Sequence, residues 1–413
     1  MLQPMPDHAN SAAELRSGQR GRERITMLLE NNPYPHDVRV RSEAESLARA
    51  GHHVTVVAPR GRGQSRRETV RGVDVIRFRL PDGSSRGAPG FAVEYGIAVV
   101  ALHLAAVREL VRGATVLHLH NPPDVLFPAG ALYRLAGRKV IFDHHDLFPE
   151  TVQVKFGSVW AARLARWCQR LTFAVANQVL ATNASYAEVA HTAGAKQPRD
   201  VTVVRNGPPA AWIDLPAQGR TGVLSEVRIA YLGAISTQDG VDGLIPVLTR
   251  LSSGPDPIRA HLTVIGDGDA RAPLEQALAE RGLGDRVTFT GRVAPERVPE
   301  LLAHADVCVD PAPATDVNER STMTKIAEYL VLGRPVVAYD LRETRHTAAD
   351  AALLVQPGDA DAFAGAIHLI ASDPELRSRL SQRARRRAAA LTWEHSERAL
   401  LGAYASLRAD GAA

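Results

Sequence analysis

Residues 318–338 read NERSTMTKIAEYLVLGRPVVA, a pattern that predicts a helix followed at once by a buried strand. Ser321 and Thr322 are typical N-cap residues, and Gly333 is a typical residue at which a helix ends. The next apolar run, residues 335–339, is rich in β-branched side chains, as expected for a strand covered on both faces. A helix and a buried strand joined by so short a turn favour an α/β fold with a parallel sheet.

The same alternation extends outward from this segment over residues 25 to about 370. We expect a helix at residues 38–50 and strands in the first half at residues 25–30, 54–58, 73–78, 115–119, 139–143, 178–181 and 201–204. In the second half, we expect strands at residues 228–232, 261–265, 286–290, 307–310, 335–339 and 353–355, followed by two helices. Residues 60–72 are expected to be a polar excursion that leads into the strand at 73–78.

A chain of 413 residues is too long for one ordinary core, so we expect two domains. The predicted organisation is a disordered extension at residues 1–24, a first Rossmann-like domain at 25–208, a linker at 209–226 and a second Rossmann-like domain at 227–390. A final helix at 391–413 is expected to pack back on the first domain. The predicted fold class is α/β, with two doubly wound Rossmann-like domains facing a central cleft.

Composition narrows the class of protein. Hydrophobic residues make up 45% of the chain and charged residues 23%, and the net charge of +4 is far from that of a nucleic-acid tail. Cys168 and Cys308 lack metal-binding spacing and are expected to be buried thiols in a reducing compartment. No apolar run reaches the roughly 20 residues that span a bilayer, and residues 1–24 lack a signal-peptide core. We therefore expect a cytoplasmic protein, with a further expectation of contact with the inner membrane surface.

Two short motifs could hold a nucleotide. Gly266 and Gly268 lie where a predicted strand meets a helix, so that backbone amides and a positive dipole end face a ligand, although a tight turn also needs glycine. Lys325 and Glu328 lie one turn apart on the predicted helix and suit a diphosphate and a ribose diol. The alternative for this pair is a surface ion pair.

These motifs, taken in order, resemble glycosyltransferase family 4. The resemblance rests on Gly266–Asp267–Gly268, on Val287 to Val293, on Ala305–Asp306–Val307 and on Lys325 to Ala338, together with residues 37–40, 50–56, 143–146 and 204–207. It implies a retaining transferase of the GT-B fold that needs no metal or other cofactor. In that family the second domain binds the nucleotide sugar and the first binds the acceptor.

The resemblance also implies site residues. Glu328 corresponds to the carboxylate that binds the donor ribose, His145 to the histidine beside the reaction centre, and Gly291–Arg292–Val293 to the loop under the base. The expected site residues are His145, Glu319 and Lys325 as catalytic groups, Gly266, Gly268, Gly291, Arg292, Arg320, Ser321, Thr322 and Glu328 on the donor, and Asp37 and Arg39 on the acceptor side. The family's second glutamate is replaced by Arg320, with Glu319 beside it, and its arginine and lysine are absent from residues 233–240. Lys325 is the expected diphosphate cation, with Arg292 and Arg320 as substitutes.

Two further features have alternative interpretations. His118, His120, His144 and His145 with Asp143 and Asp146 could form a metal centre, but their spacing fixes no ligand geometry, so we expect none. A helix expected at residues 151–173 carries Trp160 and Trp167 among arginines and suits either packing on the sheet or a membrane surface.

The expected function is transfer of a sugar from a nucleotide diphosphate sugar, taken as UDP-based, to a lipid-linked glycan, another glycan or a small metabolite. A sugar-nucleotide epimerase or a non-catalytic sugar-nucleotide-binding partner would share the fold. We expect no nucleic-acid partner.

Overall fold

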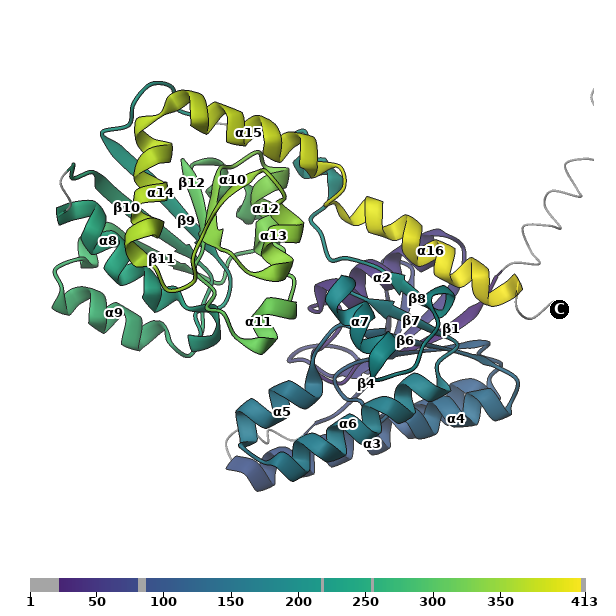
Figure 1. Ribbon diagram of the computed structural model, residues 1–413. Coiled ribbons are helices and arrows are strands. Elements are labelled where there is room, and N and C mark those ends of the chain that lie inside the picture. Colours follow the sequence, from purple (N-terminus) through teal and green to yellow (C-terminus); the bar gives the residue numbers. More distant parts are fainter. Residues whose placement is uncertain (1–21, 81–86, 217–218, 254–255, 410–413) are drawn as a thin grey trace, which may run out of the picture. The chain divides into compact units, whose positions relative to one another are not determined.

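The computed structural model describes residues 22–80, 87–216, 219–253 and 256–409 (Figure 1). The chain divides into two compact units, which we call unit 1 (Met1–Val204 with Glu397–Ala413) and unit 2 (Arg205–Ser396). Residues 1–21 of the expected extension lie outside the described residues, and the first strand begins at Arg24.

Unit 1 is built on an eight-stranded sheet with the order β3-β4-β2-β1-β5-β6-β7-β8. All its pairings are parallel except that of β3 with β4. The strands are β1 (Arg24–Leu28), β2 (His53–Pro59), β3 (Arg67–Val70), β4 (Val73–Phe78), β5 (Val116–His120), β6 (Lys139–His144), β7 (Gln178–Ala181) and β8 (Val201–Val203). Strand β3 falls in the polar excursion at residues 60–72, where no strand was predicted. An exposed edge strand has no buried face, so it shows no apolar alternation.

The helices of unit 1 are α2 (Val38–Arg49), α3 (Gly87–Val111), α4 (Phe127–Leu135), α5 (Phe148–Phe156), α6 (Val159–Val175) and α7 (Ala184–Thr192). The prediction of a single helix at residues 151–173 was wrong, because the structure has two helices there. Gly157 ends α5 in the left-handed conformation, with φ of 61°, and the Ser158 side chain caps α6 by accepting a hydrogen bond from the Ala161 amide.

Unit 2 has a six-stranded parallel sheet with the order β11-β10-β9-β12-β13-β14. Its strands are β9 (Glu226–Leu232), β10 (Arg259–Ile265), β11 (Val287–Gly291), β12 (Val307–Asp310), β13 (Val336–Tyr339) and β14 (Ala352–Val355). Its helices are α8 (Leu244–Ser253), α9 (Arg271–Glu280), α10 (Val298–Ala303), α11 (Asp316–Arg320), α12 (Thr324–Val331), α13 (Arg342–Ala348), α14 (Ala360–Ser372) and α15 (Pro374–Ala388). The last helix of the chain is α16 (Trp393–Ala409), so three helices rather than two follow β14.

The two sheets confirm the predicted fold class of α/β units built on parallel strands with flanking helices. In each unit the strand order reverses beside the first strand, between β1 and β5 in unit 1 and between β9 and β12 in unit 2. Ligands of open parallel sheets bind at the carboxyl ends of the strands near such a reversal. The loops after β1, β5, β9 and β12, with those of their neighbours, are therefore where a site is expected.

Candidate active site

His145 lies just past the carboxyl end of β6 in unit 1 and is held by a buried carboxylate. Its Nδ1 lies 2.8 Å from Oδ2 of Asp143, so the ring donates this proton to the carboxylate. The Arg39 guanidinium from α2 grips both Asp143 oxygens, at 2.7 Å from Nε and 2.6 Å from Nη2. The His145 side chain is 13% exposed, whereas that of Asp143 is fully buried. The imidazole is therefore the member of this array that can meet a substrate.

The charges of Arg39, Asp143 and His145 shift the pKa values of their neighbours in this array. Burial alone would lower the pKa of His145, but the Asp143 carboxylate outweighs it and raises that pKa above its ordinary value. Burial would likewise raise the pKa of Asp143, but the Arg39 guanidinium holds it well below its usual range. An imidazole with a raised pKa has a protonated form that donates from both nitrogens. His145 is thus prepared to donate a hydrogen bond to a group that gains negative charge.

Asn121, which sequence reasoning missed, fixes the backbone at His145. Its side-chain oxygen accepts hydrogen bonds from the amides of His145, at 2.8 Å, and Asp146, at 3.1 Å. Its side-chain nitrogen donates to the Asp146 carbonyl at 2.8 Å. The available signal was a polar residue directly after a strand end and before two prolines, His120–Asn121–Pro122–Pro123.

The expected acceptor-side role of Arg39 needs correction. Its guanidinium lies in the interior, where it also donates to the Val204 carbonyl at 2.8 Å and pairs with Glu43 at 3.2 Å. A cation engaged in this way cannot turn to an acceptor without stranding a buried carboxylate. Asp37 caps α2 by accepting a hydrogen bond from the Val40 amide at 3.0 Å and is half-buried, so acceptor contact stays a prediction for Asp37 alone.

Behind His145, four buried side chains bring potential metal-ligating atoms within 4.8 Å of one another: Glu43, His118, His120 and Asp143. Burial lowers the pKa of both histidines and raises that of Glu43 well above its usual range. The donor set fits a cation poorly, because Arg39 already occupies both oxygens of Asp143 and contacts Glu43. His118 is further tied through Nδ1 to the Tyr404 hydroxyl at 2.8 Å. We therefore interpret Glu43, His118 and His120 as uncharged side chains that surround the buried ion pair of Arg39 and Asp143.

In unit 2, Lys325 sits at the strand-order reversal, between β9 and β12. Its Nζ lies 3.2 Å from Asp310, 3.2 Å from Asp239 and 3.3 Å from the Tyr231 hydroxyl. Burial would lower the pKa of Lys325, but the carboxylates of Asp310 and Asp239 raise it instead. Lys325 is thus a buried cation already balanced by two carboxylates, neither of which sequence reasoning named. It is not the surface partner of Glu328.

Glu328, one turn further along α12, is half-buried. Burial raises the pKa of its carboxyl to about 7, and Lys325 lowers it by a smaller amount. A carboxyl with a pKa near neutrality and partial exposure is a frequent feature of binding and catalytic sites. Its ionised form can accept hydrogen bonds from two hydroxyls at once, as a ribose diol requires.

The glycines of the expected donor loop have a structural reason of their own. A Cβ on Gly266 would lie 1.9 Å from the Gly233 carbonyl oxygen, and one on Gly268 would lie 2.2 Å from that of Ile235. The loops after β9 and β10 therefore interlock so closely that only glycine fits. Gly291, at the end of β11, has φ of 67°, in the left-handed region that glycine prefers.

The helix start near Ser321 needs correction. Helix α12 begins at Thr324 with Met323 as its N-cap, whereas Ser321 is the C-cap of α11 and donates its hydroxyl to the Val317 carbonyl at 2.8 Å. Ser321 and Thr322 therefore belong to the turn that leads into α12. Glu319 accepts a hydrogen bond from the Arg342 amide at 2.7 Å and so caps α13. Arg292 and Arg320 are exposed.

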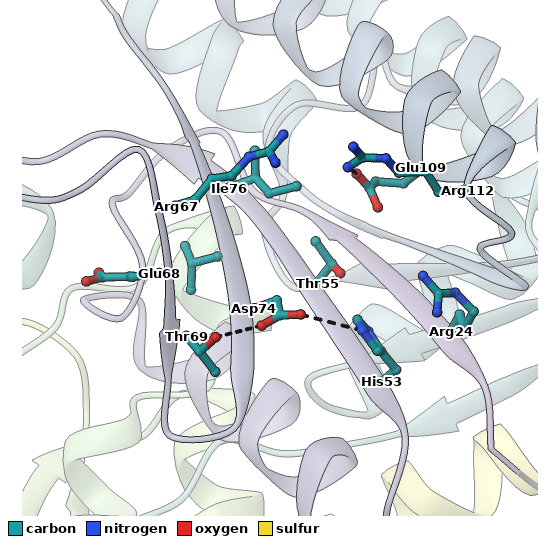
Figure 2. A pocket seen from close by; sticks show the side chains of 11 residues that line it. Arg24, His53, Thr55, Arg67, Glu68, Thr69, Asp74, Ile76, Glu109 and Arg112 are labelled. Carbon is teal, nitrogen blue, oxygen red and sulfur yellow. Dashed lines mark hydrogen bonds and ion pairs between the residues drawn. The ribbon is translucent and has the colours of Figure 1, made fainter.

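A hollow of about 570 Å³ in unit 1 lies near the amino ends of its strands, at the opposite end of the sheet from His145. Figure 2 shows that His53 and Thr69 both contact Asp74, at 3.5 Å and 2.8 Å. Arg24, His53 and Asp74 stand at the amino ends of the strands or next to them, away from the carboxyl ends where ligands of such sheets bind. This hollow is not the candidate site.

Comparison with known proteins shows the family of this chain. Residues 36–207 match a family model described as Glycosyl transferase 4-like domain, and residues 226–373 match one described as Glycosyl transferases group 1. Together the two matches cover well over half of the chain. The chain belongs to the family 4 type of glycosyltransferases. The predicted resemblance is therefore confirmed.

Two curated relatives illustrate the match. An alpha-D-kanosaminyltransferase from Streptomyces kanamyceticus is 30% identical over 168 residues, which cover 40% of this chain and 42% of that protein. A D-inositol 3-phosphate glycosyltransferase from Jonesia denitrificans is 27% identical over 234 residues, covering 53% of this chain and 54% of that one. The chain thus spans about half the length of these relatives. The Anabaena HepE structure, solved in complex with UDP-glucose, covers 93% of this chain and 99% of its own, with a TM-score of 0.69 and 17% identity, which shows a shared GT-B fold.

Proposed function

We propose that this protein is a retaining glycosyltransferase that moves a sugar from a UDP-sugar to an acceptor hydroxyl or other nucleophile. The observation that carries the proposal is the His145–Asp143–Arg39 array at the carboxyl end of the unit 1 sheet, in a chain of this family. Support for the donor class comes from the UDP-glucose complex of a protein with the same fold. Support for transfer comes from the relatives, whose names are those of glycosyltransferases.

Unit 2 is proposed to bind the donor. Glu328 would accept hydrogen bonds from the ribose hydroxyls, and Gly291 with Arg292 would lie under the base. The amides that begin α12, with the turn Ser321–Thr322, would face the diphosphate, as helix starts commonly do. The charge of Lys325 is balanced by Asp239 and Asp310, so we propose that Lys325 stabilises this turn. Arg320 and Arg292 would instead neutralise the charge of the diphosphate. Gly266, Gly268 and Glu319 would shape the loops around the sugar.

The proposed reaction occurs on one face of the sugar. The bond between the anomeric carbon and the diphosphate oxygen breaks, and the acceptor oxygen bonds to the same face of that carbon. The acceptor proton passes to the departing diphosphate oxygen, so charge and atoms balance without an outside base. His145, donating from its outer nitrogen, would stabilise the charge that develops as the bond breaks. No metal ion or other cofactor is proposed to take part in this reaction.

Metal independence is part of the proposal. The one cluster of ligating side chains in the described part of the chain is Glu43, His118, His120 and Asp143, and the Arg39 guanidinium that binds Asp143 opposes a bound cation. Turnover is expected to persist at an unchanged rate in excess EDTA. Loss of turnover in EDTA that a single divalent ion restores would overturn this part and make the histidine cluster a metal site.

The acceptor is proposed to meet unit 1, which would supply His145 and Asp37. A cytoplasmic location is proposed on the support of Cys168 and Cys308, which are both unpaired and buried. Across the described residues, no helix is long and apolar enough to cross a membrane. Contact with the inner membrane surface is proposed as peripheral.

The deciding experiment incubates the full chain with UDP-sugars and a panel of glycan, lipid-linked and small-molecule acceptors. We expect UDP release that depends on an acceptor, and a product whose anomeric configuration, measured by NMR coupling constants, equals that of the donor. Conversion of the donor sugar without an acceptor would favour an epimerase. Donor binding without turnover on any acceptor would favour a non-catalytic binding partner.

A further inference from the structure

The outward face of α3 is apolar along its described length. From Val93 to Val111, every exposed position of α3 is valine, isoleucine, leucine or glycine. The large side chains recur at intervals of three and four, which places them in one stripe: Val93, Ile97, Val100, Leu104, Val107 and Val111. Leu104 is 66% exposed and Val111 is 82% exposed. The outward face of a helix that packs on a sheet is normally polar. An exposed apolar stripe of this size therefore indicates an interaction surface.

The neighbouring helices α4 and α6 also carry exposed apolar side chains. Helices α3, α4 and α6 cover one face of the unit 1 sheet, with α4 contacting both of the others (Figure 1). Helix α6 adds Trp160, 78% exposed, and Trp167, 54% exposed, whose ring meets that of Phe127 edge-on at 5.9 Å. We call the exposed apolar side chains of these helices the apolar helix face: the α3 stripe with Leu132 and Leu135 of α4 and with Val159, Trp160, Leu164 and Trp167 of α6.

Arginines border this face, and one exposed acid, Glu68, pairs with Arg77 at 2.7 Å. The sequences of α4 and α6 contain no aspartate or glutamate, and α6 exposes Arg163 and Arg170. A hollow of about 550 Å³ runs beside Leu104 of α3, and its charged lining is arginine alone: Arg60, Arg66, Arg77, Arg79 and Arg108. Arg163 also stacks on the Trp160 ring at 5.3 Å, so charge and aromatic surface occur together.

We propose that the apolar helix face docks on an anionic lipid bilayer. Apolar side chains would enter the boundary between headgroups and acyl chains, where tryptophan is favoured, and the arginines would reach lipid phosphates. A second copy of the chain is a poorer occupant, because a twofold interface would bring two arginine-rich fringes together. The inference deepens the proposed peripheral location and does not depend on the transfer chemistry.

The test is co-sedimentation of the full chain with vesicles of phosphatidylcholine alone or mixed with phosphatidylglycerol. We expect binding to the mixed vesicles that weakens as salt rises, and little binding to the neutral ones. The double variant Val100→Gln and Leu104→Gln should partition at least about tenfold less, because two exposed apolar side chains no longer enter the lipid. Both positions are exposed, so an unchanged thermal melt is expected. Leu369→Gln, at a 46% exposed leucine of α14 in unit 2, is the matched control and should bind as the parent does.

Two results would overturn the proposal. One is equal or absent sedimentation with both vesicle types. The other is a dimer in light scattering that the double variant splits into monomers, which would assign the face to self-association. Calorimetry of UDP binding on the same preparations separates this question from the donor proposal. A chain that binds anionic vesicles but not UDP would overturn the donor site and leave the docking face standing.

Discussion

The charge networks of the two units share a buried cation and differ in the group that meets the solvent, which is an imidazole in unit 1 and a carboxyl in unit 2. In unit 1 the buried members are Arg39 and Asp143, and the functional candidate, His145, is partly exposed at the end of the array. In unit 2 the cation Lys325 is itself the buried member, enclosed by Asp239 and Asp310, and the partly exposed candidate is Glu328. In both units, therefore, a motif that looks functional in sequence contains buried charged residues that stabilise the structure and one partly exposed residue that can contact a ligand. That residue is His145 in unit 1 and Glu328 in unit 2.

The largest effect should come from removing the internal support of unit 2. Lys325→Met leaves the carboxylates of Asp310 and Asp239 without their cation in a buried setting, which typically costs about 3–5 kcal/mol. Chemical denaturation of the variant should show this loss, and adding Asp310→Asn should recover part of it. Arg320→Met, at an exposed cation of the same region, is the control and should change stability little. Intact stability with lost turnover would instead make Lys325 a free diphosphate ligand.

The second effect concerns the exposed member of unit 1. His145→Ala should lower the turnover number by about a hundredfold or more, because a donor to the developing charge is lost, with little change in the thermal melt. Wild-type turnover should also fall as pH rises through the raised pKa of His145, since the imidazolium loses its outer proton. His53→Ala, at the opposite edge of the same sheet, is the control. Near-normal turnover of His145→Ala would remove His145 from the site.

The third effect concerns donor affinity. Glu328→Ala should weaken UDP-sugar binding by about 1–3 kcal/mol in calorimetry, the range for leaving polar partners unpaired. Affinity for the wild-type chain should also decline as pH falls below about 7, where Glu328 becomes protonated. Glu319→Ala should instead cost roughly 1 kcal/mol of stability, because Glu319 caps α13, and should leave donor affinity near normal. The reverse pattern would exchange the roles of these two glutamates.

Sequence periodicity predicted most of the strands, because a buried strand shows either a continuous apolar run or, as in residues 73–78, apolar residues at alternate positions. Residues 73–78, 178–181 and 307–310 were predicted with the bounds that the structure shows for β4, β7 and β12. Strand β3 was missed because an exposed edge strand has no buried face. The break at Gly157 was missed because apolar periodicity continues on both sides of it.

The site was less predictable, because its key contacts join distant residues. Arg39 and Asp143 are 104 positions apart, and Lys325 and Asp239 are 86 apart. A motif shows that a lysine or an arginine is present but not which carboxylates already hold it. The glycines show the same limit: Gly266 was noted as a place for a ligand to approach, whereas the group that approaches in the structure is the Gly233 carbonyl.

The smallest effect is the pH dependence of stability at Glu328, and it tests directly whether this carboxyl is the shielded but reactive member of its network. Its pKa in the folded chain, about 7, lies above the ordinary value of 4.5 because burial disfavours the charge. The stability that the protonated form contributes is therefore fully present below pH 4.5 and is lost as pH rises through 7. Glu328→Gln carries no charge at any pH, so its melting temperature relative to the wild type should rise between pH 5 and pH 8, by roughly 2–4 °C for each kcal/mol. Saturating UDP should shrink this rise, because ribose hydroxyls that donate to the carboxylate lower its pKa again. A melting difference that stays flat from pH 5 to pH 8 would mean that Glu328 is as well solvated as a surface glutamate, and the parallel with His145 would fail.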